Sequence, residues 1–514
     1  MQNYTWIGPA ESVACDAEGM ATRVRALDAP CYAVQNERGV GLTNEGSVQF
    51  GGDGAAVLAM VPPTPAQQLG DPGFRATYGL DYAYMAGSMA NAIASTELVI
   101  ALGKAGMLGA FGAGGLVPNR LETAIRQIQE ALPHGPYAFN LINNPNEPAL
   151  ERQAMELYLR HGVHVIEASA YLTLTPYVVQ YRVAGLEPGP DGEVVIRNRV
   201  IAKISRREVA TLFMQPAPAK LLTALREQGL ITATQAHLAE RVPLADDVTV
   251  EADSGGHTDN RPLVCLMPSL LALRDELQAQ YHYPTPVRVG AAGGIGTPTA
   301  ALGAFMMGAA YVLTGSINHS CVEAGTSPHV KQLLAQAAMT DVMMAPAADM
   351  FEMGVNLQVL KRGTMFPLRA RKLYEIYQTY ASIEAIPPAE RQKLEQQIFR
   401  RTLDEVWADC ITFFNQRDPA QIEKAQRDPR RQMALIFRWY LGLATRWAVV
   451  GEPGREVDYQ IWCGPAMGAF NDWVRGTPLE QPENRHVAEI GRRIMDEAAL
   501  LYRVQTLRMQ GVTV

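Results

Sequence analysis

Short apolar runs recur along the chain from residue 82 onwards, and segments with helical periodicity lie between them. Three of these amphipathic segments are Asn119–Ala131, Pro148–His161 and Ser269–Gln280. Regular alternation of strand and helix predicts a parallel α/β fold, and eight repeats favour a closed (β/α)8 barrel over the alternative, a doubly wound open sheet. The predicted strands are Tyr82–Ala86, Met107–Phe111, Tyr137–Ile142, His164–Ala168, Val200–Ile204, Val248–Ala252, Val287–Ala291 and Tyr311–Thr314.

The pattern changes on both sides of these repeats. Near the amino terminus, Cys31–Gly46 is typical of a strand, a turn and a return strand, and a proline-rich connector follows. Helical segments Ala217–Gln228 and Thr232–Arg241 widen the gap between the fifth and sixth strands. We therefore predict an N-terminal β-containing extension (1–75), a TIM barrel (76–358) with a helical insertion (215–243), a helical accessory domain (359–480) and a C-terminal helix (481–514).

The predicted last helix, Asn484–Leu507, carries an apolar stripe at positions 487, 490, 494, 498, 501 and 504. Such a stripe has to be covered, so we expect it to pack on the body of the protein or on a partner chain. The second possibility would make the protein a homodimer.

Composition narrows the class of protein. The chain has 514 residues, of which 48% are hydrophobic and 19% charged, with a net charge of −7, as in soluble globular proteins. The negative charge argues against nucleic acid as a partner. Six cysteines without CxxC spacing indicate a reducing compartment and no metal site. No signal peptide is evident, so we expect a cytoplasmic protein.

One uncharged stretch, from Val289 to Val322, is long enough to span a bilayer. It contains eight helix-breaking residues, seven glycines and Pro298, and it divides naturally into strand, loop, helix and strand. We therefore interpret it as a buried βα unit and predict no association with a membrane.

Two glycine-containing loops lie inside that stretch. Gly293-Gly294 and Gly315-Ser316 each follow an apolar strand and precede a helix, where free backbone N–H groups and the helix dipole can bind a phosphate. Two such loops late in the chain match the phosphate site after strands 7 and 8 of a TIM barrel. A Rossmann site is the competing interpretation, but the glycine spacing and the missing acidic residue argue against it. Close packing of glycines is the structural alternative.

Other candidates occupy positions at the ends of predicted strands. Ala110–Gly115 is a loop of small residues that can lie against a flat ring, and Asn140 can bond the amide edge of a ring or cap a turn. Lys203 interrupts an apolar run, and a buried cation needs a partner. That partner is either an anionic cofactor such as a reduced flavin or a carboxylate in a structural ion pair.

The sixth strand ends in a loop that brings a histidine towards the barrel mouth. Gly255-Gly256 precede His257, and an imidazole titrates near neutrality and can exchange a proton with a substrate. Asp253 and Asp259 either orient His257 or cap turns. His257 is therefore the candidate catalytic residue.

These motifs together resemble the nitronate monooxygenase/2-nitropropane dioxygenase superfamily. The resemblance rests on EADSGGHTDN at 251–260, VGAAGGIGTP at 289–298 and LTGSINHS at 313–320. The stretches 79–116 and 340–367 are more closely similar to PfaD-type enoyl reductases, which act in trans on polyketide and polyunsaturated fatty acid synthases. Simple nitronate monooxygenases have a shorter loop before the histidine, which Asp253-Ser254 enlarge here.

The resemblance implies a barrel that binds FMN, with NADPH as hydride donor and an acyl-carrier-protein-bound 2-enoyl thioester as substrate. The helical domain would cover the barrel mouth, and His257 and Lys203 would be the catalytic residues. The implied partner is a polyketide or polyunsaturated fatty acid synthase with its carrier protein. The expected cofactor contacts are Ala110, Gly112, Asn140, Lys203, Gly256, Gly293, Gly294, Ile295, Gly315 and Ser316.

Two alternatives stay open from the sequence. A nitronate monooxygenase would use the same fold and FMN, with His257 as a base and oxygen as oxidant. A non-catalytic assembly module of a synthase would keep the barrel as a scaffold. An acidic carrier protein needs a basic patch, which the helical domain offers at Lys361, Arg362, Arg369, Arg371, Lys372, Arg400 and Arg401, unless these cations form an ordinary solvated face.

Overall fold

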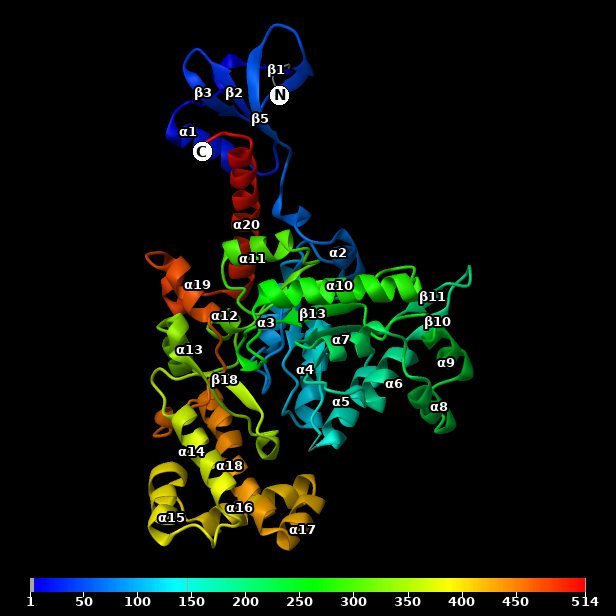
Figure 1. Cartoon of the computed structure of the whole chain (residues 1–514), viewed down its shortest axis with the longest axis vertical. Coiled ribbons are helices and arrows are strands. Elements are labelled where there is room, and N and C mark those ends of the chain that lie inside the picture. Colours follow the sequence, from blue (N-terminus) through cyan, green and yellow to red (C-terminus); the bar gives the residue numbers. More distant parts are fainter. Residues whose placement is uncertain (1–3, 146, 514) are drawn as a thin grey trace.

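A computed structural model describes residues 4–145 and 147–513, and eight parallel strands close into a barrel at its centre (Figure 1). The strand order around the barrel is β12-β13-β15-β16-β6-β7-β8-β9. The predicted TIM barrel is confirmed, and the open sheet is wrong. Each predicted apolar run overlaps one strand: β6 Tyr84–Ala86, β7 Leu108–Phe111, β8 Ala138–Ile142, β9 Val165–Ser169, β12 Arg199–Ile204, β13 Asp247–Glu251, β15 Arg288–Ala292 and β16 Val312–Thr314.

Helices surround the barrel and cover its strands. Most begin with a proline or with a serine or threonine cap, both favoured at helix starts because the first N–H groups have no partner inside the helix. They are α2 Pro72–Tyr78, α3 Thr96–Lys104, α4 Pro118–Ala131, α5 Pro148–Arg160, α6 Pro176–Ala184, α7 Arg207–Met214, α10 Leu263–Tyr281, α11 Pro298–Met306, α12 Ser316–His319 and α13 Pro328–Ala335.

The expected insertion lies between β12 and β13. Its helices α8 (Ala219–Glu227) and α9 (Ala233–Ala239) match the predicted pair of helical segments. A short hairpin of β10 (Leu186–Pro188) and β11 (Val194–Ile196) packs beside α9 and was not predicted, since three-residue strands carry little periodicity.

The uncharged stretch 289–322 forms β15, α11, β16 and α12, as the βα interpretation predicts. Within the described part of the chain, no helix combines the length and apolar character needed to cross a membrane.

The amino-terminal end of the barrel is closed. Asp247 and Arg288, the first residues of β13 and β15, form a buried ion pair in which Arg288 Nε lies 2.6 Å from Asp247 Oδ1. The Tyr78 hydroxyl at the end of α2 donates to the same carboxylate, and Phe74 stacks on Tyr311 with ring centroids 4.0 Å apart. The described residues thus fill this end, and the cavity opens at the opposite end, where the strands terminate.

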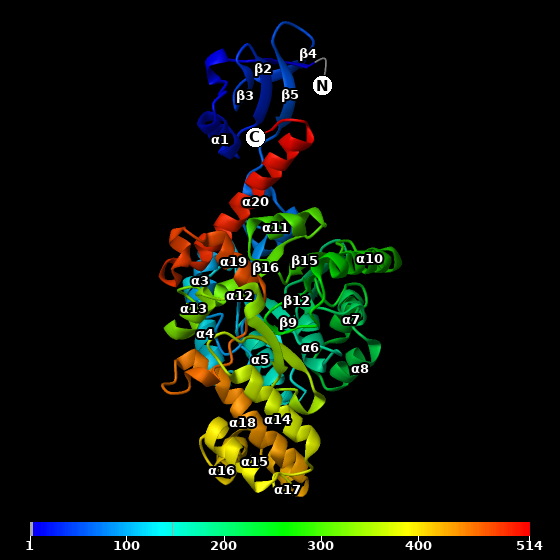
Figure 2. The same cartoon turned by 60° about the vertical axis from the view of Figure 1, so that its left-hand side comes forward.

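The N-terminal region forms an antiparallel sheet in the order β3-β2-β5-β1-β4, at the far end of the molecule from the helical lobe described below (Figures 1 and 2). The predicted hairpin appears as β2 and β3, while the remaining three strands were missed. The elements are β1 Tyr4–Ile7, α1 Ala17–Arg25, β2 Cys31–Asn36, β3 Gly39–Thr43, β4 Ser47–Phe50 and β5 Ala55–Val61.

The last helix, α20 (Val487–Met509), joins this sheet to the barrel. Its apolar stripe packs on α11 and α3, and its carboxyl-terminal end packs on β5 and α1. Arg503, fully buried, donates to the carbonyl oxygens of Val24, Ala26, Leu27, Ala29 and Pro62 and to Thr64 Oγ1. Other parts of the same chain therefore cover the stripe, and the prediction that it packs on the body of the protein is confirmed.

A helical lobe stands at the other end of the molecule (Figures 1 and 2). A sheet of β14 (Gly256–His257), β18 (Asn356–Leu360) and β17 (Val342–Pro346) lies at its base. The lobe consists of α14 Phe366–Thr379, α15 Pro388–Leu394, a π-helical turn Glu395–Phe399, α16 Leu403–Arg417, α17 Ala420–Arg427 and α18 Pro429–Val450.

The predicted helical domain after the barrel is present, but the chain between 359 and 480 does not all belong to it. After α18 the chain returns to the barrel, where Gly464 N donates to Ser316 Oγ at 2.9 Å, and α19 (Ala466–Val474) contacts α12. Sequence periodicity describes helices well, but it does not report which body a helix packs on.

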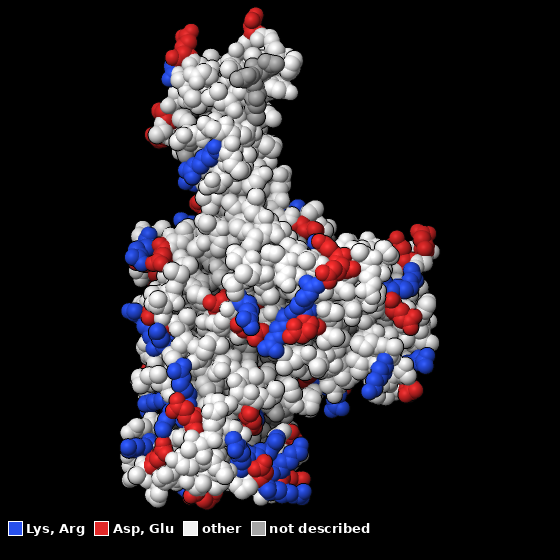
Figure 3. Space-filling view, viewed as in Figure 1, with Lys and Arg blue, Asp and Glu red and all other residues white. Residues whose placement is uncertain are grey.

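The proposed basic patch on the lobe is largely neutralised. Arg369 and Arg400 both pair with the buried carboxylate of Asp458, which offsets their charge. Figure 3 shows blue and red side chains intermixed over the lobe. The other pairs are Arg362 with Asp341, Lys372 with Glu390, and Arg401 with Asp409.

Candidate functional site

A cavity of about 1000 Å³ opens at the carboxyl-terminal ends of the barrel strands and continues along the helical lobe. A single bound cofactor or drug-sized ligand usually occupies about 300–1000 Å³, so this volume is at the upper end of that range. The cavity wall includes nine of the eleven predicted site residues: Asn140, Lys203, Gly256, His257, Gly293, Gly294, Ile295, Gly315 and Ser316.

The other two predicted contacts, Ala110 and Gly112, are corrected by the structure. Ala110 is fully buried inside β7 and packs in the barrel core. A side chain at Gly112 would meet the carbonyl oxygen of Met89, since an added Cβ would lie 1.7 Å from it. Gly112 therefore permits a close approach of two backbone segments. The part of this loop that lines the cavity begins at Ala113.

The two glycine loops have the open geometry that a phosphate requires. Gly293 and Gly294 have positive φ angles of 85° and 72°. An added Cβ at Gly293 would strike the backbone of Ala252, whereas at Gly294 and Gly315 it would meet nothing within 4 Å. Gly294 and Gly315 thus leave free space beside strand ends, where backbone N–H groups can reach an anion.

Asn140 is held in a fixed orientation at the cavity wall. Its Nδ2 donates to the carbonyl oxygen of Glu167 at 3.1 Å and to Ser169 Oγ at 2.8 Å, both on the neighbouring strand β9. Asn140 therefore caps no turn. Among the described residues its Oδ1 accepts no hydrogen bond, which leaves an acceptor for a ligand N–H.

Lys203 lies between carboxylates from two neighbouring strands. Its Nζ is 3.3 Å from Glu251 Oε1, and both side chains are largely buried. Burial alone would lower the pKa of Lys203, but the charges of Glu251 and Glu167 raise it above the ordinary value. Burial raises the pKa of Glu251, against the opposing effect of Lys203. The carboxylate partner that our sequence analysis considered for Lys203 is therefore present.

Glu167 of β9 was not predicted as a site residue, and one of its carboxylate oxygens has no hydrogen-bond partner among the described residues. Glu167 Oε2 accepts from Ser88 N at 3.0 Å, while Oε1 is buried and has no hydrogen-bond partner among the described residues. The alternation of side chains along β9 could have indicated an inward carboxylate here, but a single Glu in an apolar strand is a weak signal.

His257 has a carboxylate partner that lies far away in the sequence. Its Nε2 is 3.1 Å from Asp349 Oδ1, and β14 pairs with β18 to hold the two segments together. Burial lowers the pKa of His257, but the charge and hydrogen bond of Asp349 outweigh this and raise it. Burial likewise raises the pKa of Asp349, but the charge of His257 lowers it overall.

The two aspartates considered as orienting groups do not contact His257. Asp253 accepts a hydrogen bond from Gln358, and Asp259 pairs with Arg206 and Ser205. Among the described residues, no three His, Cys, Asp or Glu side chains gather as a metal site would require. The His257–Asp349 pair places an imidazole and a carboxylate in hydrogen-bond contact at the cavity wall.

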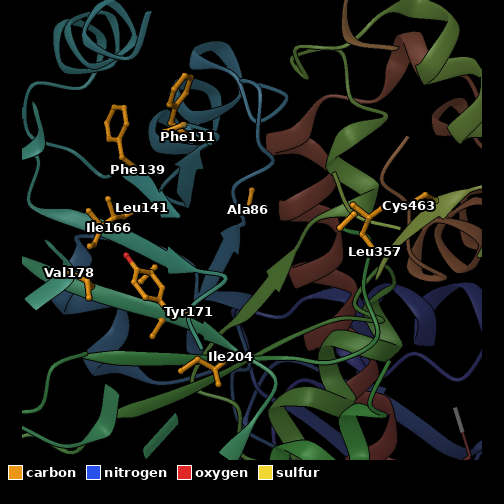
Figure 4. Packing of buried hydrophobic residues seen from close by; sticks show 14 of the residues in the cluster. Ala86, Phe111, Phe139, Leu141, Ile166, Tyr171, Val178, Ile204, Leu357 and Cys463 are labelled. Atoms are coloured by element: carbon orange, nitrogen blue, oxygen red, sulfur yellow. The ribbon is translucent and has the colours of Figure 1, made fainter. Parts of the chain in front are cut away.

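A return segment and the helical lobe complete the cavity. Gln460, Trp462 and Ala466 line it, and Leu360 N donates to Ile461 O, which joins the segment to β18. Figure 4 shows Cys463 beside Leu357 of that strand. Local sequence does not reveal this segment, because it has no motif and is positioned only by β-pairing. The lobe contributes residues of α16 and α18.

Comparison with known protein families matches the three parts of the chain separately. The nitronate monooxygenase profile matches residues 76–385, and the N-terminal domain of the fatty acid synthase protein PfaD matches residues 6–63. Residues 380–459 match the inserted helical domain of acyl-carrier-protein S-malonyltransferase.

Several curated proteins are similar over most of the chain. One of the polyunsaturated fatty acid synthase proteins of Thraustochytrium is 48% identical over 98% of the chain, and the polyketide biosynthesis protein PksE of Bacillus subtilis is 48% identical over 85%. The chain spans only 34% and 57% of the lengths of these two proteins.

Among solved structures, the enoyl reductase domain of MlnA, from the macrolactin biosynthesis cluster of Bacillus amyloliquefaciens, is 41% identical with a TM-score of 0.82. The match covers 86% of this chain and 100% of the MlnA domain. The nitronate monooxygenase profile covers residues 76–385, which is more than half of this chain. The chain therefore belongs to the nitronate monooxygenase family, and it carries a PfaD-type N-terminal domain.

Proposed function

We propose that this chain is an FMN-dependent enoyl reductase that saturates the C=C bond of a 2-enoyl thioester on an acyl carrier protein, with NADPH as hydride donor. The observation that carries the proposal is the cavity, which runs without interruption from two open glycine loops past His257 and Lys203 to the helical lobe. The likeness to the MlnA enoyl reductase domain over its whole length supports the same reaction.

The residues present fit FMN. Gly294 and Gly315 leave room for a phosphate, and Asn140 offers an acceptor to the edge of a ring. Lys203 places a cation at the cavity wall, where it would stabilise negative charge on the ring. Bound FMN would supply hydride transfer to carbon, which no protein side chain can supply.

The protein's own part in the reduction is to deliver a proton. Addition of hydride to the β-carbon of the thioester leaves a negative charge that is quenched by a proton at the α-carbon. His257 would donate this proton, and Asp349 keeps it protonated because it raises the pKa of the imidazole. Nε2 faces Asp349, so Nδ1 is the ring nitrogen available to the substrate.

This assignment predicts a pH dependence. The enoyl step should be fast below the raised pKa of His257 and should slow as the pH rises through it, since the acid is then lost. In Asp349→Asn the raising charge is gone, so the slowing should begin at a lower pH. A pH profile of flavin reoxidation by enoyl thioester measures this, and an unshifted profile would show that Asp349 does not act on the proton donor.

A second prediction concerns Lys203. Lys203→Met should lower the reduction potential of bound flavin and slow its reduction by NADPH, because negative charge on the ring loses a nearby cation. Glu251 then loses its partner as well, so the double variant Lys203→Met/Glu251→Gln is the control for an unpaired buried carboxylate. An unchanged potential with a large drop in melting temperature would mean that the ion pair is purely structural.

The setting of the reaction is part of the proposal. The relatives named above are polyunsaturated fatty acid synthase and polyketide biosynthesis proteins, so we infer a trans-acting role beside such a synthase in the cytoplasm. Whether the chain works alone or within a longer protein is separate from the chemistry of its cavity.

The test is a pair of half-reactions. Purified protein should be yellow, NADPH should bleach the flavin without oxygen, and a 2-enoyl thioester should restore the colour. Failure of NADPH to bleach the flavin, with turnover of nitroalkanes in air, would favour a nitronate monooxygenase. Protein that neither contains nor takes up FMN would be a non-catalytic assembly module.

A further inference from the structure

Helix α18 presents one regular face to the cavity. Lining residues recur with helical spacing at positions 435, 438, 439, 442, 446 and 449, and neighbouring positions such as 441 and 443 widen this face. Gly442 leaves a gap in this face, and the polar residues Thr445 and Arg446 follow one turn later. The other lining residues of the helix are apolar except for Arg438. Phe413 and Phe414 of α16, the helix that packs against α18, provide further apolar wall.

Gly442 has no structural reason to be glycine. It lies in the interior of a 22-residue helix, where glycine is less favourable than alanine, and it has no positive φ. An added Cβ would meet nothing within 4 Å. In the other described helices, glycines such as Gly103 and Gly491 are explained by an atom closer than 3.0 Å to an added Cβ. What glycine does at position 442 is to leave the cavity open.

Gly303 of α11 is the exception that provides a control. It also has open space around it, but it is exposed and lies outside the cavity. A side chain added there would project into solvent.

One turn beyond Gly442, the cavity rim carries unpaired cations. Arg446 of α18 and Arg120 of α4 are both exposed, both line the cavity, and neither makes a salt bridge or side-chain hydrogen bond to a described residue. By contrast, Arg438 on the same face of α18 pairs with Glu352 at 3.3 Å. Guanidinium groups at the mouth of a deep site suit a phosphate that stays near solvent while the rest of the ligand enters.

We propose that α18 receives the phosphopantetheine arm of the thioester substrate. The narrow arm passes the helix at Gly442, where the missing side chain makes room, and Arg446 and Arg120 bind its phosphate. The reactive end of the substrate then extends towards His257. This inference rests on the proposed enoyl reduction. It adds the part of the cavity that would bind the phosphopantetheine arm through which a carrier protein holds the substrate.

The experiment compares two thioesters of the same acyl group. Crotonyl coenzyme A contains the phosphopantetheine arm, whereas crotonyl N-acetylcysteamine lacks its phosphate and most of its length. The measured quantity is the kcat/KM for the coenzyme A thioester divided by the kcat/KM for the N-acetylcysteamine thioester. In Gly442→Leu this ratio should fall at least about tenfold, because the leucine side chain would exclude the arm from a fitted site. Gly303→Leu should leave the ratio unchanged.

The arginines give an independent measurement that does not depend on added bulk. The double variant Arg120→Ala/Arg446→Ala should lower the same ratio about tenfold or more, because charge-assisted hydrogen bonds to the phosphate are lost. The matched control is Arg126→Ala, which removes another exposed arginine of α4 that pairs with Glu122 outside the cavity.

Three outcomes overturn the inference. An equal loss with both thioesters that grows with acyl length would place the acyl tail at Gly442. A raised KM for NADPH with an unchanged thioester ratio would assign the arginines to the phosphates of the nucleotide. Unchanged ratios in all variants would mean that no arm lies along α18. Absence of turnover of either thioester by the wild-type protein would instead contradict the proposed function itself.

Discussion

Gly294→Asp is expected to yield a folded chain that no longer retains FMN. The φ of 72° at this glycine and the open space beside it place a new carboxylate where the phosphate must approach. Juxtaposed like charges cost several kcal/mol, and each 1.4 kcal/mol is a factor of ten, so the affinity should fall on the order of 100-fold or more. Flavin absorbance of the purified protein and a titration of the apoprotein with FMN measure the loss.

The control is an aspartate at a second glycine that has a similar positive φ but lies away from the proposed phosphate site. Gly192, in the loop between β10 and β11, has a φ of 75° and also has nothing within 4 Å of an added Cβ. Gly192→Asp should therefore retain FMN and differ from the wild type only slightly in stability. If Gly294→Asp binds FMN as tightly as Gly192→Asp, the glycine loops do not bind the phosphate.

His257→Ala is expected to separate the two half-reactions. Reduction of the flavin by NADPH needs no proton on carbon, so its rate should stay close to that of the wild type. Reoxidation by enoyl thioester should slow by about 10²–10⁴-fold, the usual contribution of a positioned general acid. Stopped-flow absorbance records both steps on the same sample.

The partner residue provides a graded comparison. Asp349→Asn keeps the imidazole and removes only the charge 3.1 Å from its Nε2. At low pH this variant should therefore lose less activity than His257→Ala. At high pH its rate should fall towards that of His257→Ala, because its imidazole loses the proton at a lower pH than in the wild type. Equal enoyl rates for His257→Ala and the wild type would mean that water or another group supplies the proton and that His257 only shapes the pocket.

Both predictions concern residues that local sequence already singled out. Glycines after an apolar strand and before a helix suit an anion site, so local sequence was enough to predict a phosphate site at Gly294 and Gly315, where the structure has open space. The Gly-Gly-His loop after β13 was recognisable because glycine marks close backbone approach. In the structure, the backbone that approaches Gly255 is that of Cys463.

Other parts of the site could not be read from local pattern. Asp349 lies 92 residues from His257, and only the pairing of β14 with β18 brings them together. The return segment that contains Trp462 carries no motif. Ala110 and Gly112 were misplaced because a run of small residues does not show where a strand ends and a loop begins. Five of the seven cations assigned to a docking surface on the lobe have carboxylate partners that local pattern does not reveal.

What the sequence by itself determined is the architecture, and with it the strand ends where candidate site residues are expected. Periodicity specifies eight strands and their helices, and a parallel barrel brings all strand ends to one rim by geometry alone. What only the tertiary structure decided is which charges are paired, which glycines face open space, and that α18 lines the same cavity as His257. The physical reason is that burial and ion pairing are properties of contacts between distant segments, whereas strand and helix periodicity is written in neighbouring residues.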